Sequence, residues 1–234
     1  MRIALIGYGK MGKLVKTLAE AKGHEVAVVV NEAHAGLPAE QLVEKLSVAE
    51  AAIDFSTADA VRRTVEACMA ARIPVVEGTT GWDQQRDEIE CLVNEGNGTM
   101  VFGSNFSIGV NLFYKVADYA AKLLAGFPEY EAFIEEQHHS RKKDSPSGTA
   151  LKLKEVVSRH VKIGEIVATR AGHIPGTHRL GFDGGADQIL LEHTARSREG
   201  FALGAIMAAE WAVGKKGFFE FSDVIEEICY DDKN

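Results

Sequence analysis

The strongest constraint on the fold is a glycine-rich loop that directly follows the first apolar run of the chain. Residues 2–6 form a short run rich in aliphatic side chains, and glycine then recurs at Gly7, Gly9 and Gly12 where an amphipathic segment begins. The pattern G-x-G-x-x-G between a strand and a helix is typical of the first turn of a βαβ unit. It predicts a parallel sheet with helices on both faces.

The alternation of short apolar runs with longer amphipathic segments continues over the first hundred residues. We expect strands at 2–6, 25–30, 51–55, 73–77 and 99–102, and helices at 10–22, 38–46, 58–71 and 83–95. Strands that alternate with helices in this way form βαβ units. The first part of the chain is therefore predicted to be a Rossmann-like, doubly wound parallel sheet of the α/β class.

The glycine loop has the features of a dinucleotide site. Gly7 permits a tight turn, Gly9 lets the backbone approach a diphosphate, and Gly12 allows the helix to pack closely on the strand. The N–H groups at the start of the helix can bind phosphate oxygens. We predict that NADH or NADPH is bound here by Gly7, Tyr8, Gly9, Lys10, Met11 and Gly12.

The end of the second strand bears on which dinucleotide is bound. An acidic residue about 20 positions beyond the glycine loop commonly accepts the ribose hydroxyls of NAD, and Glu32 stands at such a position. No Arg adjoins Glu32 to neutralise the 2'-phosphate of NADP. The sequence therefore favours NADH, although Lys10 or His34 could partly replace the absent Arg.

Two further loops lie where the fourth and fifth strands are expected to end, at the edge of the sheet where ligands of such folds bind. Their hydroxyl side chains and glycine backbone are suited to hydrogen-bond nicotinamide and ribose. The predicted contacts are Gly78, Thr79, Thr80, Gly103, Ser104, Asn105 and Phe106.

The pattern changes after residue 105 and indicates a second domain. Helices at 108–124 and 147–160, strands at 129–137, 165–170, 188–194 and 201–203, and a glycine-rich loop at 181–185 predict an α+β domain with a mixed sheet. Helical segments at 205–213 and 223–228 are expected to pack back on the first domain. We predict a dinucleotide-binding domain of residues 1–109 and 199–234, and a domain for substrate binding and oligomerisation of residues 110–198.

Imidazole and cationic side chains gather in one stretch of an otherwise acidic chain. The formal net charge is −8, yet His138, His139, Arg141, Lys142 and Lys143 stand close together. Histidine exchanges protons near neutral pH, and lysine is both a proton donor and a point charge. The stretch is therefore suited to acid–base chemistry on a small anion.

A helix is predicted to begin directly after this stretch. Ser147 is a candidate N-cap, because its hydroxyl can accept a hydrogen bond from the first turn. The N–H groups of Gly148 and Thr149 would then be free to bind a carboxylate. Proton donors and an anion site thus lie within a few residues of each other.

Composition and charge exclude several other classes of protein. An excess of negative charge argues against nucleic acid or an anionic membrane as a partner. No run is long and apolar enough to span a membrane, and the start of the chain lacks the features of a secretory signal, so we expect a cytoplasmic protein. Cys68, Cys91 and Cys229 are widely spaced and the histidines lack ligand spacing, so neither a disulfide framework nor a metal site is expected.

With these motifs in view, the chain resembles the 4-hydroxy-tetrahydrodipicolinate reductases, the family formerly called dihydrodipicolinate reductases, which serve bacterial diaminopimelate and lysine biosynthesis. The resemblance covers nearly the whole chain and is most specific in EEQHHSRKKDSPSGTA at 135–150. Further matching segments are 7–12, 54–56, 78–81, 105–111, 192–194 and 198–204.

The resemblance implies a function and roles for single residues. It implies reduction of a small cyclic dicarboxylate by NADH or NADPH, in a homotetramer built on the sheet of the second domain. His138 and Lys142 would be the acid–base residues. The substrate would be bound by His139, Ser147, Gly148 and Thr149.

Two other functions stay open at this point. One is another two-domain NAD(P)-dependent oxidoreductase that acts on a small anionic metabolite. An example is a phosphorylating semialdehyde dehydrogenase, which would need a nucleophilic cysteine in the substrate domain. All three cysteines of this chain, however, fall in or near the first domain. The other is a dinucleotide-sensing regulatory protein. Such a protein would be expected to have lost the stretch that contains His138 and Lys142, which is intact here.

Overall fold

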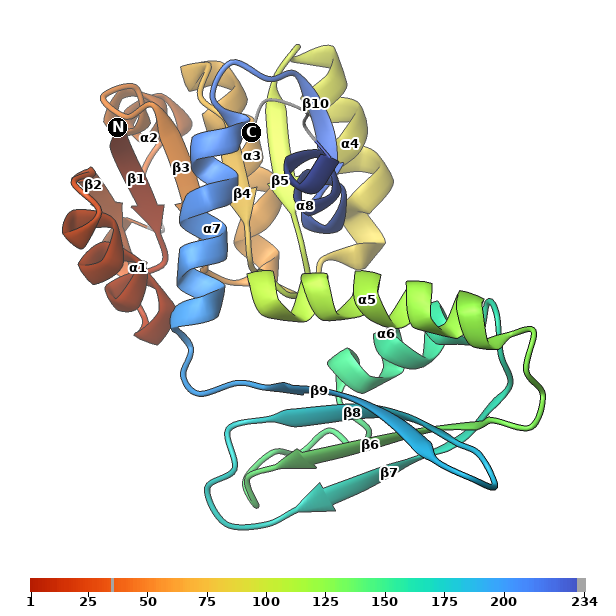
Figure 1. Ribbon diagram of the computed structural model, residues 1–234. Coiled ribbons are helices and arrows are strands. Elements are labelled where there is room, and N and C mark those ends of the chain that lie inside the picture. Colours follow the sequence, from red (N-terminus) through yellow and green to blue (C-terminus); the bar gives the residue numbers. More distant parts are fainter. Residues whose placement is uncertain (35, 231–234) are drawn as a thin grey trace. The chain divides into compact units, whose positions relative to one another are not determined.

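The computed structural model describes residues 1–34 and 36–230. The chain forms two compact units, one of Met1–Ile108 with Glu199–Asn234 and the other of Gly109–Arg198 (Figure 1). Across the described ranges, no helix is long and apolar enough to cross a membrane.

The first unit is built on a six-stranded, fully parallel sheet with the order β10-β5-β4-β3-β1-β2. Its strands are β1 (Arg2–Ile6), β2 (Glu25–Val30), β3 (Ala51–Asp54), β4 (Val75–Glu77), β5 (Thr99–Phe102) and β10 (Gly217–Glu220). From β1 the chain first passes to β2 on one side and then to β3 on the other. The strand order therefore reverses between β1 and β3, which is where doubly wound sheets bind their ligands.

Helices cover both faces of this sheet (Figure 1). They are α1 (Lys10–Ala21), α2 (Ala39–Leu46), α3 (Ala58–Ala71), α4 (Arg86–Glu95), α7 (Glu199–Ala212) and α8 (Phe221–Tyr230), with short 3-10 helices at Glu32–His34 and Asp83–Gln85. Ile3 and Leu5 of β1 face α1, α7 and α8, whereas Ala4 and Ile6 face α2, α3 and α4. Because both faces are buried, the strand is apolar throughout.

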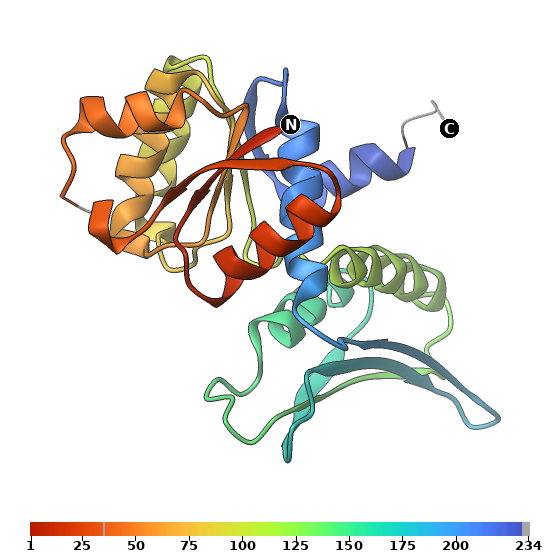
Figure 2. The same cartoon turned by 90° about the vertical axis from the view of Figure 1, so that its left-hand side faces the viewer.

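The second unit is a four-stranded mixed sheet with two helices on one face (Figure 2). Its elements are α5 (Ile108–Leu124), β6 (Glu131–His138), α6 (Gly148–Val157), β7 (Ile163–Arg170), β8 (Thr177–Asp183) and β9 (Gln188–Thr194). The order is β7-β6-β8-β9, with β6 and β7 parallel and the other pairs antiparallel. Phe113, Ile134, Leu153 and Phe182 form its core.

The predicted fold class is confirmed, and three segments differ from the predicted elements. Part of the predicted loop at 181–185 belongs to β8, because the Phe133 ring fills the place of a side chain at Gly181, where a Cβ would lie 2.1 Å from Phe133 Cζ. The predicted strand at 201–203 lies inside α7, which is buried on most sides and therefore shows no helical period. Neither β8 as a whole nor the short edge strand β10 has a predicted strand as its counterpart.

Candidate functional site

The loop after β1 borders a cavity of about 740 Å³ in the first unit. Gly7, Tyr8 and Gly9 line it together with residues at the ends of β2 and β3, so the cavity lies at the switch point of the sheet. Its volume falls in the range of roughly 300–1,000 Å³ that is usual for small-ligand sites.

The three glycines of the loop have different surroundings. Gly7 has a positive φ of 81°, and a Cβ there would lie 2.3 Å from the carbonyl oxygen of Phe55. A Cβ at Gly12 would lie 2.1 Å from the carbonyl oxygen of Gly7, whereas no described atom lies within 4 Å of a Cβ placed at Gly9. Gly7 and Gly12 are thus required by the turn itself, and Gly9 leaves open space at the first turn of α1. Open space beside free N–H groups fits a dinucleotide diphosphate.

Charged side chains of both signs line the same cavity. Glu32, from the 3-10 helix after β2, is exposed at the border of this cavity, and His34 lines the cavity as well. Lys13 of α1 and Arg63 of α3 also line it, and Arg63 donates a hydrogen bond to the carbonyl oxygen of Leu37. The sequence prediction rested on the residues next to Glu32, so Arg63 was missed because it lies about 30 residues away along the chain.

The two other predicted cofactor loops differ in their placement. Gly78, Thr79 and Thr80 line a second cavity that also involves Gly9, Lys10 and Met11. The residues Gly103, Ser104, Asn105 and Phe106 border neither of these two cavities. Phe106 is 2% exposed and packs on Phe55 and Phe221, so its side chain belongs to the core. Their contact with a cofactor stays a prediction.

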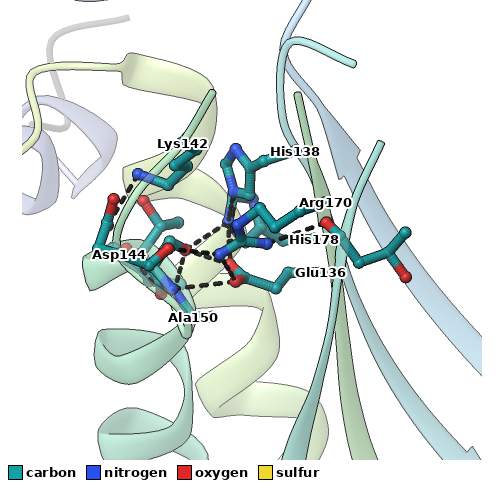
Figure 3. Close-up of polar contacts among 11 residues, drawn as sticks. Glu136, His138, Lys142, Asp144, Ala150, Arg170 and His178 are labelled. Atoms are coloured by element: carbon teal, nitrogen blue, oxygen red, sulfur yellow. Dashed lines mark hydrogen bonds and ion pairs between the residues drawn. The ribbon is translucent and has the colours of Figure 1, made fainter. Parts of the chain in front are cut away.

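In the second unit the buried carboxylate of Glu136 is surrounded by polar side chains, next to the predicted catalytic stretch (Figure 3). Glu136 is 1% exposed and lies on the helix-facing side of β6, two residues before His138. Its Oε2 lies 3.3 Å from Nε2 of His138 and 3.6 Å from Nε2 of His178. Its Oε1 accepts hydrogen bonds from the Ser147 N–H (3.0 Å) and from Nη2 of Arg170 (2.5 Å). These five residues are called the Glu136 cluster.

The hydrogen bonds keep Glu136 ionised in spite of its burial. Burial alone would raise the pKa of this carboxyl, but the hydrogen bonds from Ser147 and Arg170 and the charge of Arg170 outweigh it, so the pKa lies below its usual value. A negative charge thus sits at the centre of the cluster, paired with the guanidinium of Arg170.

The two histidines of the cluster have pKa values below that of free histidine. Burial is the main cause for both; the charges of Lys142 and Arg170 lower the pKa of His138 further, and Glu136 acts in the opposite direction. For His178 burial and the proximity of His138 lower the pKa to about 4. Both imidazoles are therefore neutral at pH 7. Their Nε2 atoms lie 3.3 Å apart, within hydrogen-bonding distance.

Lys142 and His139 lie outside the cluster. The ammonium group of Lys142 is 2.8 Å from the carboxylate of Asp144 and points away from the Glu136 cluster (Figure 3). One quarter of the Lys142 side chain is exposed. His139 is half-buried, and its Nδ1 has no hydrogen-bond partner among the described residues.

The start of α6 lies directly against the cluster. The Ser147 hydroxyl caps the helix by accepting the Ala150 N–H at 3.2 Å and donates to Oε2 of Glu136, so the predicted N-cap is confirmed. Ser147 is 1% exposed and its hydroxyl is fully engaged. Gly148, by contrast, is exposed at the first turn, next to Thr149. The helix start is thus fixed to the sheet through Ser147, whereas its first turn at Gly148 is exposed, as an anion site requires.

Three members of the cluster are spaced like metal ligands. Ligand atoms of Glu136, His138 and His178 all lie within 4.8 Å of one another. The carboxylate, however, already accepts hydrogen bonds on both oxygens and faces Arg170, whose positive charge opposes a cation. We therefore interpret the arrangement as a hydrogen-bonded network.

Sequence reasoning missed Glu136, Arg170 and His178. Arg170 and His178 come from strands that join β6 only in the folded sheet, so their spacing along the chain carries no signal. Glu136 did carry one: it occupies an inward-facing position of β6, where Ala132 and Ile134 are apolar. A carboxylate in such a position must be paired, since an isolated buried charge is costly.

Both halves of the chain match sequence models of one family. Residues 1–106 match "Dihydrodipicolinate reductase, N-terminus" and residues 109–225 match "Dihydrodipicolinate reductase, C-terminus". A 4-hydroxy-tetrahydrodipicolinate reductase from Christiangramia forsetii is 33% identical over 245 residues, covering 97% of this chain and 99% of the relative. One from Archaeoglobus fulgidus is 38% identical over 264 residues, covering 97% and 100%.

Solved structures show the same fold. A dipicolinate-bound dihydrodipicolinate reductase from Paenisporosarcina sp. TG-14 superposes with a TM-score of 0.80 at 22% identity, covering 96% of this chain and 99% of that one. A probable dehydrogenase from Thermotoga maritima has a TM-score of 0.60 at 11% identity, covering 97% and 93%.

Proposed function

Since the chain belongs to the dihydrodipicolinate reductase family, we propose that it reduces 4-hydroxy-tetrahydrodipicolinate with a nicotinamide dinucleotide, in lysine and diaminopimelate biosynthesis. The observation that carries this assignment is the match of both halves of the chain to one family. Curated relatives at 33% and 38% identity are matched over nearly their full length, so both units of this chain have counterparts in them.

The first unit would hold the dinucleotide. The diphosphate would lie against the open backbone at Gly9 and the N–H groups of the first turn of α1, and Thr79 and Thr80 border the adjoining cavity. When bound, the dinucleotide supplies the hydride. The fit of the residues rests on the space at Gly9, which no described side chain fills.

The second unit would hold the substrate through its carboxylates. A relative with the same fold has been solved with dipicolinate, an aromatic dicarboxylate. The N–H groups of Gly148 and Thr149 at the start of α6, together with His139, are suited to such a ligand. Ser147 would act indirectly, because its hydroxyl is occupied in holding Glu136 and the helix start.

His138 and Lys142 would share the acid–base work. Loss of the 4-hydroxyl group as water gives a conjugated imine, and reduction of this imine takes up one hydride and one proton. The ammonium of Lys142, which is paired with Asp144 and belongs to a side chain that is one quarter exposed, would donate this proton. His138 is neutral and can accept or return a proton. Glu136 and His178 would position the His138 ring, since both face its Nε2 and leave Nδ1 as the other proton-exchanging atom.

The reaction can be tested with substrate made in place. Pyruvate and aspartate semialdehyde are condensed enzymatically, and oxidation of NADH and of NADPH is followed separately after this protein is added. We expect oxidation that depends on both precursors. No oxidation of either dinucleotide would overturn the assignment.

The acid–base roles can be tested with single substitutions. His138→Ala and Lys142→Ala should each lower turnover by roughly 10²- to 10⁴-fold, the usual effect of losing such a group. Lys143→Ala is the matched control, because Lys143 is an exposed neighbour with the same charge. Turnover that survives either of the first two changes would remove that residue from the mechanism.

For the cofactor, we propose that NADH is preferred while NADPH is accepted. Glu32 favours the free ribose hydroxyls of NADH, whereas Lys13 and Arg63 bring positive charge to the same cavity for a 2'-phosphate.

Two substitutions separate these effects. Glu32→Arg should shift the ratio of kcat/KM values toward NADPH, and Arg63→Met should reduce kcat/KM for NADPH more than for NADH. Unchanged ratios in both variants would remove both residues from the ribose site.

A further inference from the structure

Two carboxyl groups lie buried beneath the loops that border the second cavity of the first unit. Asp54 ends β3 and Glu77 ends β4, and the register of these neighbouring parallel strands places the two residues side by side. Both are 0% exposed. The acid–base chemistry proposed for the second unit uses neither of them.

Each carboxyl group holds the loop that follows its own strand. Oδ1 of Asp54 accepts the Ser56 N–H at 2.7 Å, and Oε1 of Glu77 accepts the Thr79 N–H at 2.7 Å. The Ser56 N–H also lies 3.1 Å from Oγ1 of Thr79, which joins the two loops to each other. Ser56 and Thr79 both line the second cavity, so the carboxyl pair determines the backbone geometry of that cavity.

The remaining oxygen of each group lacks a donor. Oδ2 of Asp54 and Oε2 of Glu77 are buried without a hydrogen-bond partner in the described part of the chain. The two side chains are close enough to hydrogen-bond to each other when one is protonated. Two adjacent carboxylates in a buried site cannot both stay ionised, and such pairs retain a proton.

No cation is among the main groups of the described residues that act on the pair. Val61 and Val65 of α3 belong to the apolar core beside it. The polar groups that act on the pair are the hydroxyls of Ser56, Thr64 and Thr79, and Cys68 of α3 is the titratable neighbour, with a pKa raised mainly by its own burial. Burial raises the pKa of both carboxyls, and the charge of Asp54 raises that of Glu77 further.

We propose that Asp54 and Glu77 share one proton, which links the two loops, and that release of this proton to solvent separates the loops and weakens dinucleotide binding. Without the proton the pair would carry two negative charges, with no cation among the main described groups that act on them, directly beneath a site for an anionic ligand. Asp54 and Glu77 are thus positioning residues for the cofactor. This inference rests on the proposed cofactor site of the first unit and not on the acid–base residues of the second.

The test measures the dissociation constant for NADH as a function of pH, without substrate. In Glu77→Gln the amide oxygen can still accept the Thr79 N–H, and the amide nitrogen can donate permanently to Asp54. In the wild-type protein the dissociation constant should rise at alkaline pH by up to about tenfold per pH unit, the limit for one linked proton. Glu77→Gln should remove this rise, whereas Glu90→Gln, an exposed carboxyl on α4, should keep it. Parallel profiles for wild type and Glu77→Gln would overturn the proposal.

A second measurement does not depend on the variant or on the ligand. The infrared spectrum of the wild-type protein at neutral pH should contain the carbonyl band of a protonated carboxylic acid, and this band should disappear in the same pH range in which NADH affinity falls. Absence of the band at neutral pH would refute the shared proton. If NADH fails to bind at any pH, the proposed cofactor site is wrong, while the infrared band still decides whether the proton is shared.

Discussion

Gly9 is a residue at which the requirements of the fold and those of the ligand can be separated. Its φ of −78° is available to any residue, and no described atom lies within 4 Å of a Cβ placed there. Gly9→Ala should therefore change the free energy of unfolding by no more than about 0.5 kcal/mol. The same methyl group would occupy the space of the diphosphate, and we expect NADH affinity to fall at least about tenfold, a loss of roughly 1.4 kcal/mol.

Urea unfolding and an NADH titration on the same preparation measure both quantities. Gly126→Ala is the control, since Gly126 also has open space around it but lies in the second unit. Wild-type affinity in Gly9→Ala would contradict the placement of the diphosphate at this loop.

His178 makes a prediction about stability at acid pH. Its folded-state pKa of about 4 lies below the usual histidine value of 6.5, so the unfolded chain binds more protons between these two values. Stability should therefore fall as the pH drops from 6.5 toward 4. The His178 contribution to this fall is about 3 kcal/mol at most, given roughly 1.4 kcal/mol per pKa unit.

His178→Gln removes the titrating group while keeping a side chain that can hydrogen-bond. We expect the difference in unfolding free energy between pH 7 and pH 4 to be smaller in this variant than in the wild type, measured by urea unfolding at both pH values. Substitution of His173, which is exposed, provides the control. An equal difference in His178→Gln and wild type would show that His178 is not buried in its neutral form.

At the scale of elements, Ser147 connects α6 to the sheet. Loss of an N-cap hydroxyl costs about 1 kcal/mol. Because this hydroxyl also donates to the buried carboxylate of Glu136, Ser147→Ala should cost about 2 kcal/mol in all. Ser158→Ala, at the exposed other end of the same helix, should stay within about 0.5 kcal/mol. Equal effects at both ends, measured by urea unfolding, would mean that neither the cap nor the contact with Glu136 contributes measurably.

Elements whose pattern is local could be predicted from the sequence, and those completed by distant partners could not. The βαβ alternation and the cap at Ser147 depend on residues close in sequence, and both are found. In the sequence Gly181 suggests a loop, whereas in the folded sheet the ring of Phe133, on the neighbouring strand β6, covers it. The sequence of α7 shows no helical period of apolar and polar residues, because the helix is buried on most sides.

The candidate site follows the same rule. The stretch that contains His138 and Lys142 is visible as a motif, whereas the residues that surround His138 arrive from β7 and β8. Arg63 likewise reaches the cavity of Glu32 from α3. The sequence thus predicts which segments face a ligand, and strand pairing determines the charges that accompany them.

For the whole molecule, the outer face of the second sheet bears on assembly. The helices cover one face only, and on the other Phe133 lies over Gly181, beside Leu190 on the neighbouring strand. Val167 and Leu190 are 58% and 47% exposed, and Arg179 forms ion pairs with Glu135 and Glu192 around them. An apolar centre with a polar rim is typical of a protein interface. We propose that this face joins copies of the chain into the homotetramer that the family resemblance implies.

Light scattering of the purified protein should then give a mass four times that of the chain. Val167→Glu combined with Leu190→Glu places two charges at the centre of the face and should shift the mass toward that of a dimer or monomer, because unpaired charges are costly to bury. Val48→Glu is the matched control, since Val48 is 46% exposed in the first unit, and it should leave the mass unchanged. A double variant that remains tetrameric would place the contact on another surface, and a wild-type monomer would remove the assembly altogether.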